Sequence, residues 1–132
     1  MKEAFLKKIK NDYPEYTFRE GKKFLFRPPK TIVIGPDERF SELLLLHELS
    51  HAILGHRDFQ TDIKRLKMES EAWDKAKELA SEYKIKVDED YIQDELDTYR
   101  DWLHQKSRCP KCGLTRFQTP DGQYHCPRCE NF

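Results

Sequence analysis

Two histidines and a glutamate interrupt one of the most apolar stretches of this chain, LLLLHELSHAILGH at residues 43–56. On a helix, positions i and i+4 share a face, so His47 and His51 can direct their imidazoles at one point, with Glu48 beside it. This HExxH spacing is typical of zinc sites in which both histidines bind the metal and the glutamate acts as general base. Because burying a charge without a partner is costly, a bound metal explains polar residues on an apolar helix. We therefore predict that His47 and His51 bind zinc and that Glu48 is catalytic.

A catalytic zinc keeps three protein ligands and one open position, so a third ligand is required. The metzincin spacing would place a histidine at position 57, which is Arg57, and His56 is one residue short of it. The segment MESEAW offers Glu69 and Glu71 instead. Glu69 falls on the apolar stripe of its predicted helix, whereas Glu71 is mostly turned away. Glu69 is the preferred third ligand, with Glu71 or a histidine left open.

A second group with metal-ligand spacing lies near the end of the sequence. Two CxxC pairs are separated by 13 residues, with a Pro-Asp-Gly turn inside the spacer: Cys109 and Cys112, then Cys126 and Cys129. Two such pairs can close a tetrahedral site of four thiolates, as in a structural zinc ribbon. His125 precedes a ligand and could substitute for one, but it is interpreted as hairpin surface. The sequence therefore predicts two zinc ions, one catalytic and one structural.

Hydrophobic periodicity places these groups on a small set of elements. Short apolar runs predict a helix over 3–10, a hairpin from 16–20 and 22–27, and a strand at 31–34. Longer periodic segments predict helices over about 42–54, 61–83 and 88–106, the first of them ending near Gly55. The fold class is therefore α+β, with a domain at 1–106 and a zinc ribbon at 107–132. The strand at 31–34 could be a sheet edge that receives an extended peptide.

The composition of the chain limits the binding partners and the cellular compartment that we expect. Lys and Arg number 24 against 24 Asp and Glu, which removes any general argument for binding a polyanion. No apolar run approaches a membrane span, and the first residues do not resemble a signal peptide. We expect a cytoplasmic protein without membrane contact, where cysteines stay reduced and serve as metal ligands.

The segments RFSELLLLHELSHAILGH and ESEAWDKA together resemble the ImmA/IrrE family of small metallopeptidases, over about residues 31–80. This resemblance implies a gluzincin-type, zincin-like domain in which a strand leads into the HELxH helix. It also implies that His47, His51 and the first glutamate of ESEA, Glu69, are the zinc ligands and that Glu48 is the base. The residue after ESEA is Trp73, where the family often has Asn or Asp.

The expected function is that of a zinc metallopeptidase that cleaves a regulatory or partner protein, with the ribbon as a docking module. One alternative is the resemblance to SprT-like proteases, which also join an HExxH helix to a C-terminal ribbon and act on proteins attached to DNA. That resemblance implies a histidine as third ligand, either His56 or His104. Another alternative is a non-catalytic zinc-binding adaptor. Phe117 and Tyr124, among basic residues of the ribbon, could also stack on nucleic-acid bases.

Overall fold

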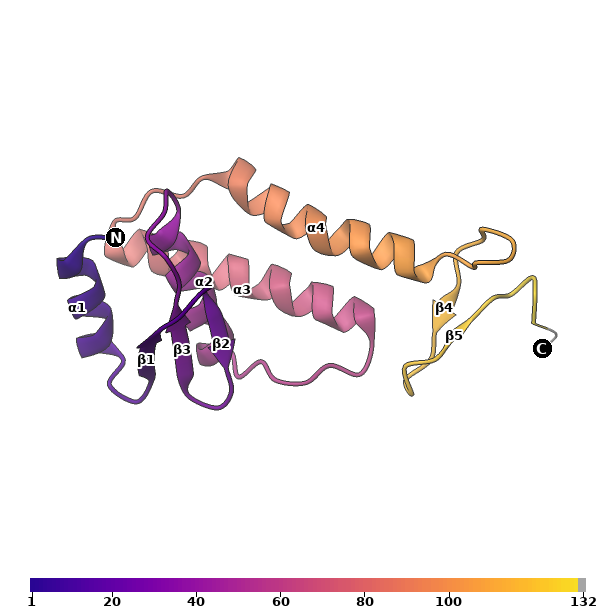
Figure 1. The fold of residues 1–132 in the computed structure, drawn as a ribbon, viewed down its shortest axis with the longest axis horizontal. Coiled ribbons are helices and arrows are strands. Elements are labelled where there is room, and N and C mark those ends of the chain that lie inside the picture. Colours follow the sequence, from indigo (N-terminus) through magenta and orange to yellow (C-terminus); the bar gives the residue numbers. More distant parts are fainter. Residues whose placement is uncertain (131–132) are drawn as a thin grey trace. The chain divides into compact units, whose positions relative to one another are not determined.

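The fold is that of a computed structural model, which describes residues 1–130. Its helices and strands confirm the α+β class, and each predicted helix is present within about two residues of its expected ends. Figure 1 shows their arrangement within each part of the chain. In chain order they are α1 (Glu3–Asp12), β1 (Thr17–Glu20), β2 (Leu25–Arg27), β3 (Thr31–Ile34), α2 (Ser41–Ile53), α3 (Asp62–Tyr83), α4 (Glu89–Ser107), β4 (Phe117–Gln118) and β5 (Tyr124–His125).

The chain divides into two compact units. The first contains residues 1–57 and 71–87, and therefore α1, the three-stranded sheet, α2 and the second half of α3. Within the described residues, the second contains residues 58–70 and 88–130, and therefore the start of α3, α4 and the β4–β5 hairpin. The domain boundary expected near residue 106 stays a prediction.

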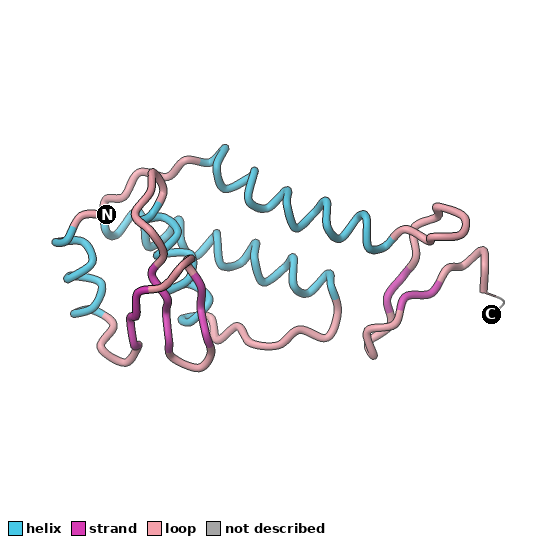
Figure 2. Tube along the Cα trace, in the orientation of Figure 1, coloured by secondary structure: helices cyan, strands magenta, loops and turns pink. Residues whose placement is uncertain are grey.

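The sheet of the first unit has the order β1-β3-β2 (Figure 2). Strand β1 pairs with β3 in parallel, with Thr17 opposite Thr31, and β2 pairs with β3 in antiparallel, with Leu25 opposite Val33. The predicted hairpin between residues 16–20 and 22–27 is therefore wrong, since β2 and β3 form the hairpin instead. The strand at 31–34 is also not an edge, because it is paired on both sides.

Gly21 explains why the hairpin was misplaced. A turn glycine between two strands typically adopts a positive φ, but Gly21 does not. A Cβ added there would lie 2.5 Å from Cγ1 of Val33, so the residue is glycine because the chain passes closely over β3. A glycine between two segments of alternating apolar and polar residues can therefore mark a turn or a close approach to another strand. The sequence does not distinguish these two cases.

Helix α2 packs as a core element. Leu45, Leu46 and Leu49 are fully buried, in agreement with the expectation of a helix that is apolar nearly all round. Helix α3 contributes Trp73, which is 2% exposed, and a run of small and apolar residues that are buried with it: Ala72, Ala76, Leu79 and Ala80. The residues of the first candidate site thus lie in the best-packed part of the first unit.

The second unit is built around α4. Asp88 caps this helix, because its carboxylate accepts a hydrogen bond of 3.0 Å from the backbone N–H of Tyr91. Ile92 and Leu96 are its buried apolar residues. After α4, β4 and β5 pair in antiparallel with Phe117 opposite His125. None of the helices in the described chain is both long and apolar enough to cross a membrane.

Candidate metal centres

Helix α2 brings the first three predicted residues together. His47 and His51 are buried, at 7% and 8% exposure, and the Oε2 atom of Glu48 is buried as well. The Nε2 atoms of the two histidines lie 3.2 Å apart, and one ligand atom from each of the three side chains lies within 4.8 Å of the others. The one-turn spacing predicted from the sequence is therefore realised as three donor atoms that converge on one point.

The donor set and its geometry fit zinc. Two Zn–N bonds of ordinary length at a tetrahedral angle place their nitrogen atoms about 3.3 Å apart. The Nε2 atoms of His47 and His51 are 3.2 Å apart without rearrangement. Neutral imidazole nitrogen is also a donor that zinc favours. These two histidines can therefore hold a zinc ion, with the carboxylate of Glu48 beside it.

Trp73 packs directly on His47, one of the candidate ligands. Its ring lies 4.0 Å from the ring of His47, centroid to centroid, with only 21° between the planes. A stacked indole restricts rotation of the imidazole and keeps bulk water from that side. In the sequence, Trp73 was notable only as the residue that follows ESEA. Nothing in the spacing alone indicated that it would contact a metal ligand.

His56 supports the other ligand. Its Nδ1 atom lies 2.9 Å from Nδ1 of His51, so the two nitrogens of His51 face His56 on one side and His47 on the other. If Nε2 of His51 binds a metal, its proton lies on Nδ1 and is donated to His56. His56 is therefore placed to orient His51, and a role for it as the third ligand stays an open alternative.

The end of α2 explains how His56 returns to the helix. Gly55 adopts φ 69°, and its N–H donates to the carbonyl of Ala52, while the N–H of His56 donates to the carbonyl of His51. These two bonds form a Schellman motif, which reverses the chain and favours glycine at the left-handed position. The dipeptide Gly55-His56 was the signal in the sequence, since a Schellman glycine brings the next residue back over the last turn.

The remaining candidates for third ligand have different surroundings. The group of converging donor atoms contains only His47, Glu48 and His51 within the described residues. Glu69 is half-buried, whereas Glu71 and His104 are exposed. The role of Glu69 as third ligand stays a prediction.

The four cysteines come together in the second unit. Sγ of Cys109 lies 3.8 Å from Sγ of Cys129, and Sγ of Cys112 lies 3.6 Å from Sγ of Cys126. Tetrahedral Zn–S bonds of ordinary length separate sulfur atoms by about 3.8 Å. All four are free thiols and form one group of possible metal ligands. The cluster fits a structural zinc and not a pair of disulfides.

The backbone around the cysteines favours thiolate. The N–H groups of Cys112 and Lys111 point at Cys109 and lower the pKa of its thiol to about 6. The N–H of Cys129 lies 3.4 Å from Sγ of Cys126 and lowers the pKa of that thiol too. Contacts with the other thiols of the cluster raise the pKa of Cys129 instead. Zinc binds the deprotonated form, so the two turns favour metal binding at Cys109 and Cys126.

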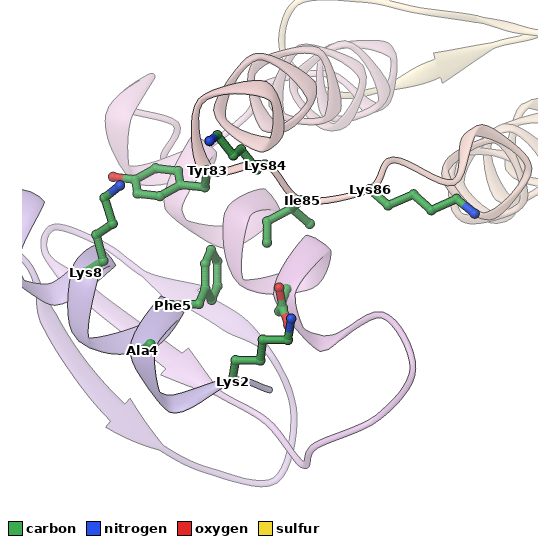
Figure 3. A pocket seen from close by; sticks show the side chains of 9 residues that line it. Lys2, Ala4, Phe5, Lys8, Tyr83, Lys84, Ile85 and Lys86 are labelled. Atoms are coloured by element: carbon green, nitrogen blue, oxygen red, sulfur yellow. The ribbon is translucent and has the colours of Figure 1, made fainter.

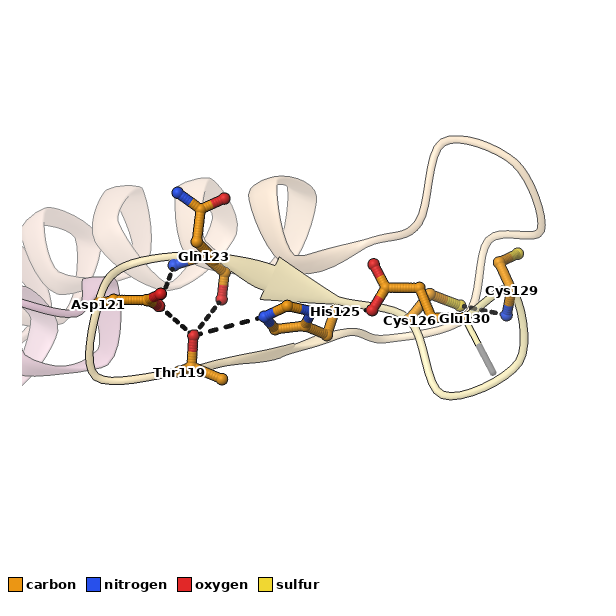
Figure 4. A network of polar contacts seen from close by, with 7 residues as sticks. All are labelled: Thr119, Asp121, Gln123, His125, Cys126, Cys129 and Glu130. Carbon is orange, nitrogen blue, oxygen red and sulfur yellow. Dashed lines mark hydrogen bonds and ion pairs between the residues drawn. The ribbon is translucent and has the colours of Figure 1, made fainter. Parts of the chain in front are cut away.

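The ring of His125 has its nitrogens turned toward the hairpin's own side chains (Figure 4). Nδ1 lies 2.8 Å from Oε2 of Glu130, and Nε2 lies 3.5 Å from Oγ1 of Thr119. The cysteine group does not include this histidine. The interpretation of His125 as hairpin surface is consistent with both contacts.

A buried aspartate fastens the hairpin within its unit. Asp62 is 4% exposed, accepts a hydrogen bond of 2.6 Å from the hydroxyl of Tyr124, and lies 3.0 Å from Nζ of Lys106. Its backbone N–H donates to the side chain of Gln118 at 2.7 Å. Burial by itself raises the pKa of Asp62, but the bonds from Tyr124 and Lys106 outweigh it and leave the pKa below its usual range. Asp62 was not among the residues predicted from the sequence.

We compared the chain with protein-family models, with curated proteins and with solved structures, and none of the three comparisons gives a match. The assignment of the two groups as possible metal centres therefore rests on their geometry alone.

Proposed function

We propose that the first unit is a zinc-dependent peptidase of the ImmA/IrrE type and that the second unit carries a structural zinc ribbon used for docking. The observation that carries the proposal is the convergence of two Nε2 atoms, 3.2 Å apart, with a glutamate carboxylate on one buried helix. A glutamate beside two converging imidazoles is the group that metal-assisted peptide hydrolysis needs as its general base.

In this proposal each residue has a separate task. His47 and His51 hold the zinc, which when bound polarises the substrate carbonyl and makes water more acidic. The carboxylate of Glu48 accepts the proton of the attacking water and then delivers it to the leaving amide nitrogen. Trp73 keeps His47 in orientation, and His56 does the same for His51.

Glu69 is proposed as the third ligand. It precedes Trp73 by one helical turn, so both lie on the same face of α3, and Trp73 stacks on His47. Glu71 is separated from Trp73 by about 200° around the helix and is exposed. The helical phase of α3 therefore supports Glu69 over Glu71.

The proposed substrate is a protein or peptide in extended form. Because β3 is paired on both sides, strand addition to this sheet has to occur at β1 or β2. Phe117 of the hairpin is 46% exposed, although its ring lies 5.5 Å from the ring of His125. Tyr124 is half-buried, with Arg116 4.8 Å above its ring and its hydroxyl on Asp62. Because of this difference in exposure, docking of a partner, whether protein or nucleic acid, would use the surface at Phe117 before Tyr124.

The decisive experiment combines metal counting with an unbiased activity test. Native mass spectrometry should find two zinc ions per chain in the wild type and in Glu48→Gln, and one in Glu69→Ala. His104→Ala should keep both. A proteome-derived peptide library incubated with the wild type should show new N-termini, and Glu48→Gln should lower their rate of formation by about 10²- to 10⁴-fold.

Two results would contradict the proposal. A wild-type protein with two zinc ions that cleaves nothing in the library would favour a non-catalytic zinc-binding adaptor. A loss of one zinc in His104→Ala, with none lost in Glu69→Ala, would favour a histidine ligand as in SprT-like proteases.

A further inference from the structure

An open cavity of about 480 Å³ lies in the first unit, and Figure 3 shows the side chains that line it. Aromatic and aliphatic side chains form its apolar wall. Phe5 is buried and meets the ring of Tyr83 edge to face at 5.9 Å, while Ile85 adds an aliphatic surface. The hydroxyl of Tyr83 donates to Asp12 at 2.6 Å, which fixes the ring. The cavity therefore has a preformed apolar wall, in which the rings of Phe5 and Tyr83 stand nearly perpendicular to each other.

The rim of the cavity is cationic. Four lysines line it against a single carboxylate, that of Glu42: Lys2, Lys8, Lys84 and Lys86. Among residues 1–130, none of these four ammonium groups forms an ion pair with a carboxylate. Four cations around one apolar hollow attract an anion, and their charges are not neutralised from within the described chain.

Lys84 occupies an unusual backbone position. It has φ 57°, in the left-handed region, and is the only non-glycine residue among 1–130 with a positive φ. The N–H of Ile85 donates to the carbonyl of Ala80 at 2.8 Å, so α3 ends in a Schellman motif with lysine where glycine is favoured. The backbone of Lys84 is strained at this position, and its side chain lines the cavity. Such strain is typical of residues with a functional role, which here would be ligand binding.

We propose that this cavity binds a small aromatic molecule with a carboxylate or phosphate group. Phe5, Tyr83 and Ile85 offer apolar surface to an aromatic body, and the lysines offer ammonium groups to the anion, with Nζ of Lys8 lying 5.4 Å from the centre of the Tyr83 ring. Its volume lies within the range of small-molecule sites. The lining includes none of His47, Glu48 or His51, so this proposal goes beyond the proposed peptidase function and does not depend on it.

The test uses probes that contain both halves of the proposed ligand or only one. Isothermal titration calorimetry on the full zinc-loaded chain should show 1-naphthyl phosphate and 1-naphthoate binding at least tenfold more tightly than 1-naphthol and inorganic phosphate. Equal affinity of the complete probes and of either half would overturn the proposal. So would the absence of measurable binding of both complete probes at millimolar concentration.

Paired variants locate the site. Lys8→Gln with Lys86→Gln should weaken binding of 1-naphthyl phosphate at least fivefold. Lys7→Gln with Lys10→Gln makes the same change of charge at exposed positions of α1 outside the lining, and should change it less than twofold. An equal effect of both pairs would mean general charge attraction and would contradict the assignment.

The metal centre and Lys84 are tested by two more variants. His47→Ala with His51→Ala removes the ligands of a zinc that could itself bind phosphate, and affinity for the probe should stay within twofold of wild type. Loss of binding there would move the probe to the metal centre and overturn the proposal. Lys84→Gly should raise the Tm by roughly 2–4 °C by relieving the left-handed residue, and weaken probe binding at least threefold. Unchanged binding would overturn the task assigned to Lys84.

Discussion

The two candidate metal centres are placed on opposite kinds of structure. His47, Glu48 and His51 lie on a helix whose leucines are fully buried, so the surrounding core fixes the ligands. The four cysteines lie around a hairpin whose strands have two residues each, and Cys109 and Cys126 are themselves its most buried side chains. A core can form without metal in the first case, whereas in the second the thiol cluster takes the place of a core. We therefore expect that a metal at the first centre would contribute little to folding, whereas a metal at the second would hold the hairpin together.

Among these variants, loss of the cysteine cluster should have the largest effect on folding. Cys109→Ser with Cys126→Ser removes two of four ligands, and structural zinc in such small modules provides an apparent 10–16 kcal/mol, roughly, of binding free energy. We expect the amide signals of residues 107–130 to collapse to random-coil positions in an NMR spectrum, while signals of α2 and the β1-β3-β2 sheet stay in place. A folded hairpin in this variant would contradict the contrast between the two centres.

Trp73→Ala tests the claim that the surrounding core, and not the metal, fixes the residues of the first centre. Removal of a fully buried tryptophan should lower the free energy of unfolding by about 3–5 kcal/mol, and loss of its stack on His47 should also weaken zinc binding there. Leu79→Ala is the matched control, since Leu79 is buried on the same helix and should destabilise without a change in zinc affinity. Equal zinc affinities in the two variants, measured by chelator competition, would mean that Trp73 is only a core residue.

Asp62→Asn tests whether the hydrogen bond and the ion pair of Asp62 also stabilise the hairpin. The variant keeps an oxygen acceptor for Tyr124 but loses the charge opposite Lys106, and should cost about 1–3 kcal/mol at neutral pH. The pKa of Asp62 is lowered on folding, so its stabilisation is present above the unfolded pKa of about 4 and is lost as pH falls through the folded value.

The pH dependence gives that experiment a second readout. The difference in unfolding free energy between wild type and Asp62→Asn should stay constant from about pH 8 to pH 5, because Asp62 is ionised in both folded and unfolded chains over this range. If burial dominated and raised the pKa, the difference would already shrink above pH 5. Urea titrations at three pH values in the presence of zinc are sufficient to decide.

The sequence predicted those features that depend on short spacing. The i, i+4 relation of His47 and His51 and the two CxxC turns are local, so their convergence follows from backbone geometry. The sheet order was missed because Gly21 permits a close approach to Val33 and not a turn, which depends on a partner distant in sequence. Asp62 was missed for the same reason, since its partner Tyr124 is 62 positions away.

Substitution of His56 should have the smallest of these effects, a change in the zinc affinity of the first centre alone. A histidine ligand needs its second nitrogen held, and loss of such a partner typically costs 10- to 100-fold in metal affinity. His56→Ala should therefore weaken the first zinc by that factor, leave the cysteine site unchanged, and alter the free energy of unfolding little. His56→Gln, which keeps an acceptor, should recover most of the affinity.

Gly55→Ala separates orientation of the ligand from stability of the helix end. Alanine at φ 69° should destabilise the chain by about 1 kcal/mol and, by disturbing the Schellman turn, also displace His56. Gly55→Ala and His56→Ala should then both shift the ¹⁵N signals of the His51 ring, from the pattern of a single Nδ1–H tautomer toward that of a mixture of tautomers. Should His56→Ala leave those ring signals and the zinc affinity as in wild type, the 2.9 Å contact would be incidental. The orientation of His51 would then be due to the core alone, which is the property that distinguishes this centre from the cysteine cluster.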